Sequence, residues 1–340
     1  MNGPTGAKAP RLFLGLDGGK SKTVCLIATE AGEVVGWGRA GNADDSTVPF
    51  DAAISAVADA VRAALDRAGA SADAVESACF GLAGVAFPED AVRFEEAVRT
   101  RVQFRDVLVC NDALVALRAA SVDRTGIVIS AGTHLSVAVG TSTGETWFSG
   151  WASVDGAGGG EAGRRTMWAV LHAADGRGPA TALSGAVAAA TGEGPDALLR
   201  RIARGDADEP FLAGLAPVLF RTEAIGGDAV AREIITGLGQ EMATWVTGLR
   251  ARFDLRDRPI VYLAGGLFRA QGTLLTDRLA QEVHRTDPAV AFQRIQREPV
   301  AGAVLESIAR SGIAINDLVA DRLIASGPGP SFYDTTSQPA

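Results

Sequence analysis

A set of three strand-like segments, with a glycine turn after the first, occurs twice along the chain. This repetition limits the possible folds more than any other feature. In each half, three apolar runs come first and strand-like and helical segments follow. In the first half the strand-like runs lie at 11–17, 23–29, 33–40, 77–85 and 106–112, with helical patterns at 50–68, 88–102 and 113–120. In the second half strand-like runs lie at 125–132, 134–140, 145–151, 259–268 and 289–295, helical segments dominate from 164 to 253, and two more lie at 271–283 and 301–310. The sequence therefore predicts two duplicated α/β domains that share a cleft.

The domain boundary is expected near residues 118–124. Residues 1–118 would form the N-terminal domain with a loose N-terminal tail, and residues 119–325 the C-terminal domain with a helical insertion. Residues 326–340 are rich in Gly, Pro, Ser and Thr and are expected to form a flexible tail. With 340 residues, of which 47% are hydrophobic, the chain has enough apolar side chains for two cores.

Charge and composition exclude several classes of protein. The net charge of −8 argues against binding to a nucleic-acid backbone. No apolar run is long enough to span a membrane, and the first residues, MNGPTGAKAP, lack the pattern of a secretory signal. A cytoplasmic protein with no membrane and no nucleic-acid partner is expected. The three cysteines stand far apart in apolar segments, so we expect small buried side chains and no disulfide framework.

The first glycine turn, DGGKSKT at 17–23, carries the clearest chemical signal. A carboxylate at a strand end could hold Mg²⁺ through water, and a tight hairpin of glycines and hydroxyls presents N–H groups to phosphates. An ordinary Asp-Gly hairpin is the alternative. GGKS at 18–21 is not the end of a Walker A loop, because Leu14 stands where its first glycine belongs. GWGRAG at 36–41 has the letters of a dinucleotide fingerprint, but no helix follows it.

Asp112 occupies the junction between a strand and a helix. It could cap the helix or act as a catalytic base. AGTH at 131–134 and AGGLF at 264–268 are two further glycine turns at strand ends, where backbone could approach a ligand closely. Each turn alone is common, whereas several at the ends of apolar strands in one chain are not.

The order of these motifs carries a family resemblance. DGGKSKT, GRAGN, FGLAGV, VCNDALVAL, GIVISAGT, GW with a glycine-rich stretch, DGRGPATAL, YLAGGLF and PVAGAVL follow one another from about residue 12 to 310. The chain resembles the N-acetylglucosamine kinase branch of the BadF/BadG/BcrA/BcrD ATPases, in the sugar kinase–Hsp70–actin superfamily. The resemblance implies two ribonuclease H-like (actin-like ATPase) domains with an interdomain cleft, the use of ATP and Mg²⁺, and a homodimer.

The resemblance also implies roles for particular residues. The first phosphate motif corresponds to Asp17, Gly18, Gly19, Ser21 and Lys22, the second to Gly132 and Thr133, and the adenosine motif to Gly265 and Gly266. The sugar would be bound by Asn42, by Asp112 and by the segment that begins with Trp151, Ala152 and Ser153. Asp112 would be the general base, and Asp17 and Asp112 would be the metal-binding acids.

Three departures from the family pattern bear on function. Lys20 replaces a glycine of the first motif, and we expect its side chain to point to solvent, with a phosphate contact as the alternative. The second motif reads GTHL, so His134 replaces a glycine at a position that could require positive φ. An Asp-Glu pair of the sugar segment becomes Ala157 and Gly158, which removes charged hydrogen bonds of roughly 1.5–3 kcal/mol.

These observations predict an ATP-dependent kinase for an amino sugar such as glucosamine or N-acetylglucosamine, or for a similar polyol. Two alternatives stay open. The chain could phosphorylate a specialised-metabolite sugar or a cyclitol, which would suit the altered sugar segment. It could also be a degenerate member that binds nucleotide or sugar without turnover.

Overall fold

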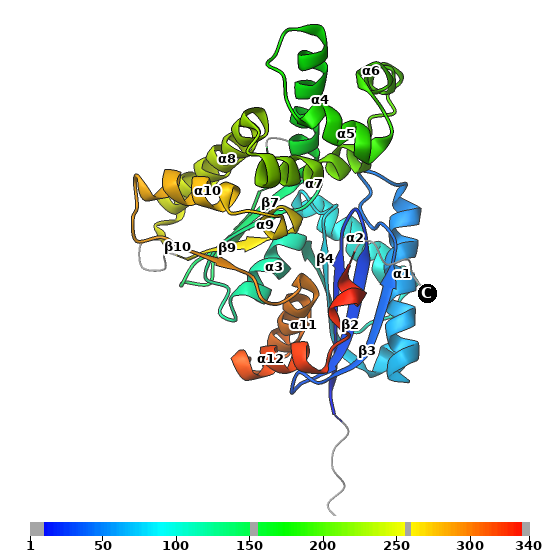
Figure 1. Cartoon of the computed structure of the whole chain (residues 1–340). Helices are drawn as coiled ribbons and strands as arrows, with labels where there is room; N and C mark the ends of the chain where they lie inside the picture. The colour runs from blue at the N-terminus through cyan, green and yellow to red at the C-terminus, as the bar shows by residue number, and fades with distance from the viewer. Residues whose placement is uncertain (1–9, 150–155, 256–259, 335–340) are drawn as a thin grey trace, which may run out of the picture. The chain divides into compact units, whose positions relative to one another are not determined.

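The computed structural model describes residues 10–149, 156–255 and 260–334. The chain divides into two compact units, which are coloured along the chain in Figure 1. Unit 1 comprises Met1–Arg124 and Gln296–Ala340, and unit 2 comprises Thr125–Ile295. Each unit contains one five-stranded sheet.

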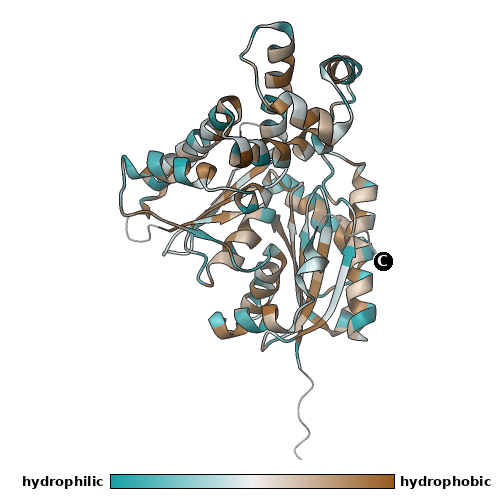
Figure 2. Ribbon diagram, viewed as in Figure 1, coloured by the Kyte–Doolittle hydropathy of each residue, from teal (hydrophilic) through white to brown (hydrophobic). Residues whose placement is uncertain are grey.

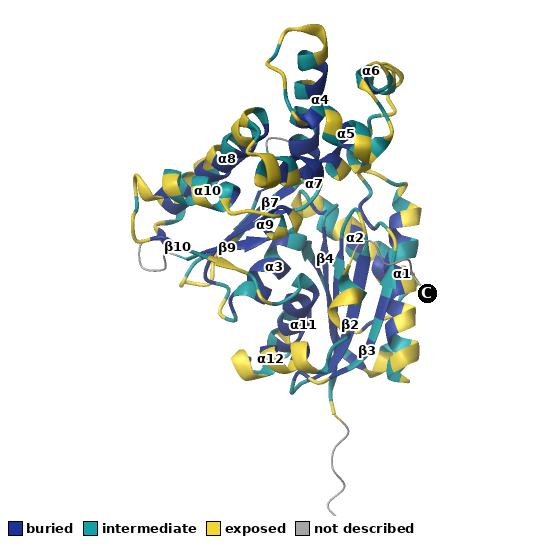
Figure 3. Ribbon diagram, viewed as in Figure 1, coloured by how far each residue is buried: buried dark blue, intermediate teal, exposed yellow. Residues whose placement is uncertain are grey.

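The sheet of unit 1 has the strand order β3-β2-β1-β4-β5. Its strands are β1 (Leu12–Gly18), β2 (Thr23–Thr29), β3 (Val34–Ala40), β4 (Val75–Leu82) and β5 (Val107–Asn111). The first three strands are antiparallel, and β4 and β5 run parallel to β1. The strands carry mainly apolar residues (Figure 2) and are largely buried (Figure 3), as a sheet covered on both faces requires.

Alternation along β1 assigns its side chains to the two faces. Leu14 and Leu16 pack in a core with α1 (Phe50–Ala68) and α2 (Pro88–Arg101). Phe13 packs on the opposite face, in a core with α11 (Pro299–Arg310) and α12 (Asp317–Ser326). Because side chains alternate along a strand, Asp17 shares the face of Phe13. The short 3₁₀ helices Ala72–Ala74 and Pro330–Tyr333 complete the unit.

Helix α3 (Asp112–Ala120) approaches its neighbours closely because two glycines leave room for it. A Cβ atom on Gly81 of β4 would lie 2.3 Å from Cγ2 of Val115. A Cβ atom on Gly302 of α11 would lie 1.9 Å from the carbonyl oxygen of Val115. These contacts fix the start of α3, and with it Asp112, at the carboxyl end of the parallel strands.

The sheet of unit 2 has the same topology, with the order β10-β9-β6-β7-β8. Its strands are β6 (Gly126–Ala131), β7 (Leu135–Gly140), β8 (Thr146–Phe148), β9 (Ile260–Ala264) and β10 (Ala291–Arg294). The helices are α4 (Gly159–Asp175), α5 (Leu183–Thr191), α6 (Pro195–Arg204), α7 (Glu209–Gly226), α8 (Ala229–Phe253), α9 (Gly266–Arg269) and α10 (Leu274–His284). One apolar core joins this sheet to its helices. The repeated topology confirms the predicted fold class of two ribonuclease H-like α/β domains.

The C-terminal part of the chain differs from the prediction. Residues 296–325, expected in the second domain, belong by their contacts to unit 1, because α11 packs on β1, β2 and β4. Residues 327–334, expected in a flexible tail, also belong to unit 1, since Phe332 and Tyr333 pack against the core around α11 and α12. Local composition suggested a tail, but these two aromatic side chains pack on a core to which β1 and β2, from the start of the chain, also contribute.

The described residues include no helix that is both long and apolar enough to cross a membrane. Cys25 and Cys79 are buried and Cys110 is partly buried, all as free thiols, in agreement with the expectation of small apolar packing residues. Burial raises the pKa of the Cys25 thiol far above its ordinary value.

Candidate active site

The first glycine turn connects β1 to β2 at the carboxyl end of β1. The turn closes through a hydrogen bond from the Gly19 amide to the Lys22 carbonyl oxygen, 3.0 Å apart. A side chain on Gly18 would collide with Leu82, since its Cβ atom would lie 2.6 Å from Cδ2 of that residue. Ser21 is exposed at the tip. The turn is thus a tight hairpin whose tip can be approached from solvent.

The loop that carries Asn42 is held against this turn. The Ala43 amide donates to the carbonyl oxygen of Gly19 at 3.1 Å, and the Thr23 hydroxyl donates to the carbonyl oxygen of Gly41 at 2.7 Å. Inside the loop, Asn42 Oδ1 accepts from the Asp44 amide at 2.7 Å. The loop and the first phosphate turn therefore form one structure, and Asn42 organises it.

Lys20 does not point to solvent, so that expectation is wrong. Its side chain is 16% exposed, and Nζ lies 3.9 Å from Oδ2 of Asp44, whose side chain is 3% exposed. An acidic partner that is buried in the adjoining loop attracts the ammonium group, and the sequence of the turn alone could not reveal this partner. Lys20 thus joins the phosphate turn to the Asn42 loop.

Asp112 is the first residue of α3 and is not its cap. Asn111 caps the helix, because its Oδ1 accepts from the Ala113 amide at 2.9 Å. The Asn111 Nδ2 group donates to the carbonyl oxygen of Val85 at 2.8 Å, which fixes the capping side chain. The capping role considered for Asp112 therefore belongs to its neighbour.

Asp17 and Asp112 lie close enough to affect each other's charge. The pKa of Asp17 is raised to about 7, first by burial and next by the Asp112 carboxylate, while the Lys22 ammonium group opposes the rise. Glu298, the residue that precedes α11, makes a smaller contribution in the same direction as Asp112. The carboxyl end of the sheet thus gathers several acids, and Glu298 was missed in the sequence because it follows no strand of unit 1.

The acids of unit 1 fit a phosphate-bound Mg²⁺ ion better than a metal site made of protein alone. Among the described residues, no three His, Cys, Asp or Glu side chains are grouped so that they could hold a metal ion. Mg²⁺ typically takes one or two carboxylates and completes its shell with water and substrate phosphates. Asp17 and Asp112 supply two carboxylates whose mutual repulsion a cation would relieve.

The second glycine turn, in unit 2, is held by the beginning of α4. The carbonyl oxygens of Gly132 and Thr133 accept from the amides of Gly159 and Gly160, both at 2.8 Å. A Cβ atom on Gly158 would lie 2.6 Å from backbone atoms of His134. The turn and the glycine-rich stretch are therefore packed backbone against backbone.

The two departures from the family pattern in unit 2 lie in this contact. His134 has a negative φ, because Arg124 and Asp254 are the non-glycine residues with positive φ in the part of the chain that the structure describes. Position 134 therefore does not require a positive φ in this structure, and histidine fits there without backbone strain. Ala157 is fully buried and Gly158 has no room for a side chain. A carboxylate at either position would not fit this arrangement.

Gly265 brings the third glycine turn beside the second. It has φ of +93°, and a Cβ atom there would lie 2.4 Å from the carbonyl oxygen of Ala131, the residue before Gly132. Gly266 begins α9 and has no atoms close to its Cβ position. Unit 2 thus places the predicted adenosine motif next to the predicted second phosphate motif.

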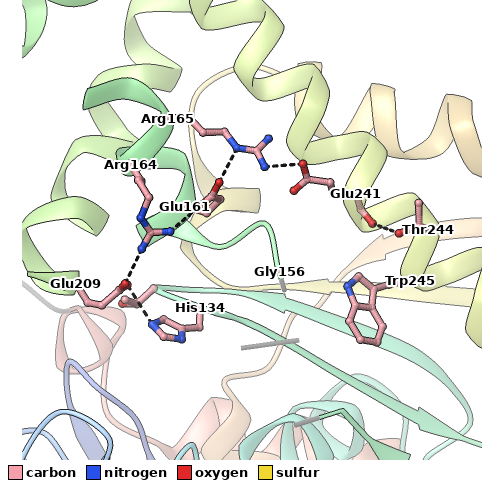
Figure 4. Close-up of a pocket in the computed structure, with 10 residues that line it drawn as sticks. His134, Gly156, Glu161, Arg164, Arg165, Glu209, Glu241, Thr244 and Trp245 are labelled. Carbon is pink, nitrogen blue, oxygen red and sulfur yellow. Dashed lines mark hydrogen bonds and ion pairs between the residues drawn. The ribbon is translucent and has the colours of Figure 1, made fainter. Parts of the chain in front are cut away.

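A cavity of about 540 Å³ adjoins the second turn within unit 2 (Figure 4). It is lined by Thr133, His134, Gly156, Glu161, Arg164, Arg165, Glu209, Glu241, Thr244 and Trp245. Its size is in the range of small-molecule sites.

A continuous chain of charged side chains crosses the wall of this cavity. His134 Nε2 lies 3.1 Å from Glu209 Oε2, and Arg164 donates to the other carboxylate oxygen of Glu209 at 3.0 Å. The remaining links run from Arg164 through Glu161 and Arg165 to Glu241. Three carboxylates face two guanidinium groups and one imidazole, so the wall is strongly polar without a large excess of either charge. Sequence reasoning missed this network because its members lie on four separate elements.

Trp151, Ala152 and Ser153, predicted to contact sugar, lie outside the described residues. The other predicted residues fall into two groups. Unit 1 brings Asp17, Gly18, Gly19, Lys22, Asn42 and Asp112 to one end of its sheet, and unit 2 brings Gly132, Thr133 and Gly265 together. That these residues bind nucleotide, metal and sugar stays a prediction.

Comparisons with known proteins identify relatives of the whole chain. The N-acetylmuramic acid/N-acetylglucosamine kinase of Clostridium acetobutylicum is 25% identical over 306 residues, which cover 88% of this chain and 99% of the relative. A proposed N-acetylglucosamine kinase from Chromobacterium violaceum has a similar structure, with a TM-score of 0.72 at 23% identity over 88% of this chain and 100% of the other. A ROK family glucokinase from Streptomyces griseus, solved with glucose and AMPPNP, gives a TM-score of 0.58 at 20% identity over the same shares.

A sequence profile extends this likeness through both units. The profile of the BadF/BadG/BcrA/BcrD ATPase family matches residues 14–307, from the first strand of unit 1 to α11, which packs on the sheet of that unit. The match thus includes all three glycine turns and both acids. The chain belongs to the BadF/BadG/BcrA/BcrD ATPase family.

Proposed function

We propose that this chain is an ATP-dependent kinase that phosphorylates an amino sugar, with Asp112 as the general base. The observation that carries the proposal is the pairing of Asp17 and Asp112 beside a tight glycine hairpin. A phosphate-binding turn, a metal-binding acid and a proton acceptor are the groups that phosphoryl transfer to a hydroxyl requires. The relative from Clostridium acetobutylicum, a kinase for two amino sugars, supports the substrate class.

In this proposal the residues of unit 1 divide the work. The turn of Gly18, Gly19 and Ser21 binds phosphate, with Lys22 as its cation. Asp112, which follows a cap that fixes the start of its helix, takes the proton of the attacking hydroxyl. Mg²⁺ held by Asp17 and Asp112 would neutralise charge on the phosphates. Asn42, Asp112 and the segment that begins with Trp151, Ala152 and Ser153 would position the sugar.

The cavity of unit 2 is proposed to hold the nucleoside part of ATP. Thr133, a residue of the second glycine turn, lines this cavity. Phosphates bound along that turn would therefore lie at the edge of the cavity, next to the nucleoside. A polar wall of nearly balanced charge suits a ribose and a base better than an anion. Gly265 and Gly266 would contribute the backbone next to the adenosine. The resemblance also leads us to propose a cytoplasmic homodimer, which size-exclusion chromatography with light scattering would test.

We propose that the acceptor sugar makes other contacts with this protein than N-acetylglucosamine makes in the family pattern. Ala157 is fully buried and Gly158 has no space for a side chain, so neither replaces the lost carboxylates. This observation favours a second candidate within the same reaction, a specialised-metabolite sugar or a cyclitol as acceptor. Such acceptors have hydroxyls that main-chain groups and neutral side chains can bind.

The test is release of ADP from Mg-ATP across a panel of glucosamine, N-acetylglucosamine, N-acetylmuramic acid, glucose and cyclitols. We expect one acceptor class to stimulate release, and Asp112→Asn to lower the rate by about 10²- to 10⁴-fold, the usual contribution of a general base. Asp59→Asn on the exposed face of α1 is the matched control. Full activity of Asp112→Asn contradicts the role of Asp112. Silence with every acceptor, with nucleotide still bound, would favour the non-catalytic alternative.

A further inference from the structure

The chain continues past the end of the family match at residue 307 and returns to the phosphate turn of unit 1. After α12, the 3₁₀ helix Pro330–Tyr333 lies against the sheet of unit 1, where it is drawn in red beside β2 (Figure 1). The Nζ group of Lys22 donates a hydrogen bond to the carbonyl oxygen of Tyr333. A segment outside the family match thus contacts a residue of the first phosphate motif.

This C-terminal segment, residues 330–334, is held by a second basic residue and by packing. The Arg39 guanidinium group donates to the carbonyl oxygen of Phe332 at 3.1 Å and to that of Asp334 at 2.6 Å. The rings of Phe332 and Tyr333 meet edge to face, with centroids 5.2 Å apart, and both pack against the core around α11. Burial raises the pKa of Tyr333 to about 12, as expected for a phenol that is mostly removed from water. These hydrogen bonds and ring contacts therefore hold the Tyr333 carbonyl oxygen in one position.

Lys22 stands where its orientation would affect a bound phosphate. Its own carbonyl oxygen closes the turn by accepting from Gly19, and its ammonium group is near enough to Asp17 to attract that carboxylate. A lysine side chain has four rotatable bonds and loses much of its rotamer freedom when it is fixed. An ammonium group carries three N–H donors, so a bond to one carbonyl oxygen does not use up its capacity for phosphate.

We propose that the C-terminal segment positions Lys22 for nucleotide phosphate, through the Tyr333 carbonyl oxygen, and that Arg39 holds the segment in place. The inference rests on the proposed function only in that the first turn binds the phosphates of ATP. The segment pre-organises the cation, so that less conformational freedom is lost when the nucleotide binds. Arg39 and the segment act through Lys22.

Two truncations test the role of the segment. Deletion of residues 330–340 removes the carbonyl oxygen that holds Lys22, whereas deletion of residues 335–340 keeps it and is the matched control. We expect the longer deletion to weaken AMPPNP binding by about threefold to tenfold, a fraction of the full entropy of a lysine side chain. Adenosine binding should stay unchanged, because adenosine has no phosphate for Lys22 to bind. Isothermal titration calorimetry with each ligand measures both effects.

Substitutions separate a positioning role from a general loss of stability. In a Lys22→Met background the longer deletion should cause no further loss of AMPPNP affinity, because both changes remove one interaction. Arg39→Met should weaken AMPPNP binding by part of the amount that the longer deletion does, and Arg39→Lys should recover some of that affinity. Independent, multiplying effects of Lys22→Met and the deletion would overturn the inference. Tighter AMPPNP binding after the deletion would overturn it as well, since the contact would then be inhibitory.

The design keeps the inference apart from the proposed function. Binding of AMPPNP needs no acceptor, so an unknown sugar does not affect the result. Equal affinity of the full chain and the longer deletion would refute only the inference. Failure of the full chain to bind AMPPNP would refute both.

Discussion

A close approach between α4 and α7 in unit 2 gives a specific prediction for Gly163. This residue of α4 faces Leu212 of α7, and a Cβ atom there would lie 1.7 Å from the Leu212 carbonyl oxygen and 2.5 Å from its carbonyl carbon. Ordinary contact begins at 3.4 Å, so Gly163→Ala requires the helices to separate by about 1.7 Å. Both contact atoms belong to the backbone and cannot rotate away.

The expected cost follows from two opposing effects. Overpacking of this size costs about 3 kcal/mol, the upper end of the usual range, and the better helix propensity of alanine returns about 1 kcal/mol. A net loss of about 2 kcal/mol should lower Tm by about 4–8 °C for a unit of this size. Gly248→Ala in α8 is the matched control, because nothing lies within 4 Å of its Cβ position. Differential scanning calorimetry compares the variants, and a Gly163→Ala protein as stable as the control would refute the reasoning.

Three further predictions concern other contacts. Gly158→Glu, which restores the family residue, should lower Tm because its Cβ atom would lie 2.6 Å from the backbone of the second turn. An unchanged Tm would show that the turn moves to make room for the side chain. Lys20→Gly should destabilise unit 1 by about 1–3 kcal/mol in urea unfolding, because buried Asp44 loses its cation, and added Asp44→Asn should recover part of the loss. The Arg310 guanidinium holds the pKa of Asp106 below its usual value of 3.8, so this pair stabilises the fold above that pH and the stabilisation is lost as the pH falls below it. Asp106→Asn should therefore lose less stability than the wild type between about pH 6 and about pH 3 in urea unfolding, and equal losses would contradict the assignment.

Local pattern was sufficient for most of the elements. The helix predicted at 50–68 coincides with α1, because apolar residues recur at helical spacing and Gly69 ends it in the left-handed conformation. In the two three-strand openings, β1, β2, β6 and β7 were visible because they are largely buried and read as apolar runs. The glycine turns were visible because they follow these strands directly, and so the position of Asp17 could be predicted.

Contacts between distant segments could not be predicted from the sequence. The adjacent pair Asn111 and Asp112 offers two residues that can each cap a helix, and only the fold decides that Asn111 does so. No helix was predicted between residues 311 and 325, so α12 was missed although Asn316 caps it. The link between His134 and Glu209 joins residues 75 positions apart, and no local signal announces it.

The departures of unit 2 from the family pattern are related to each other in space. His134 adds bulk to the second turn, and the residue that packs on its backbone, Gly158, has lost its side chain. The imidazole that His134 introduces has an ion-pair partner in Glu209, which Arg164 also holds. Random decay of an unused site would leave added side chains without such matching partners and would leave buried polar groups unsatisfied. The partner that the His134 imidazole has in Glu209 therefore supports our proposal of a site remodelled for another ligand over the alternative of a site that has lost its function.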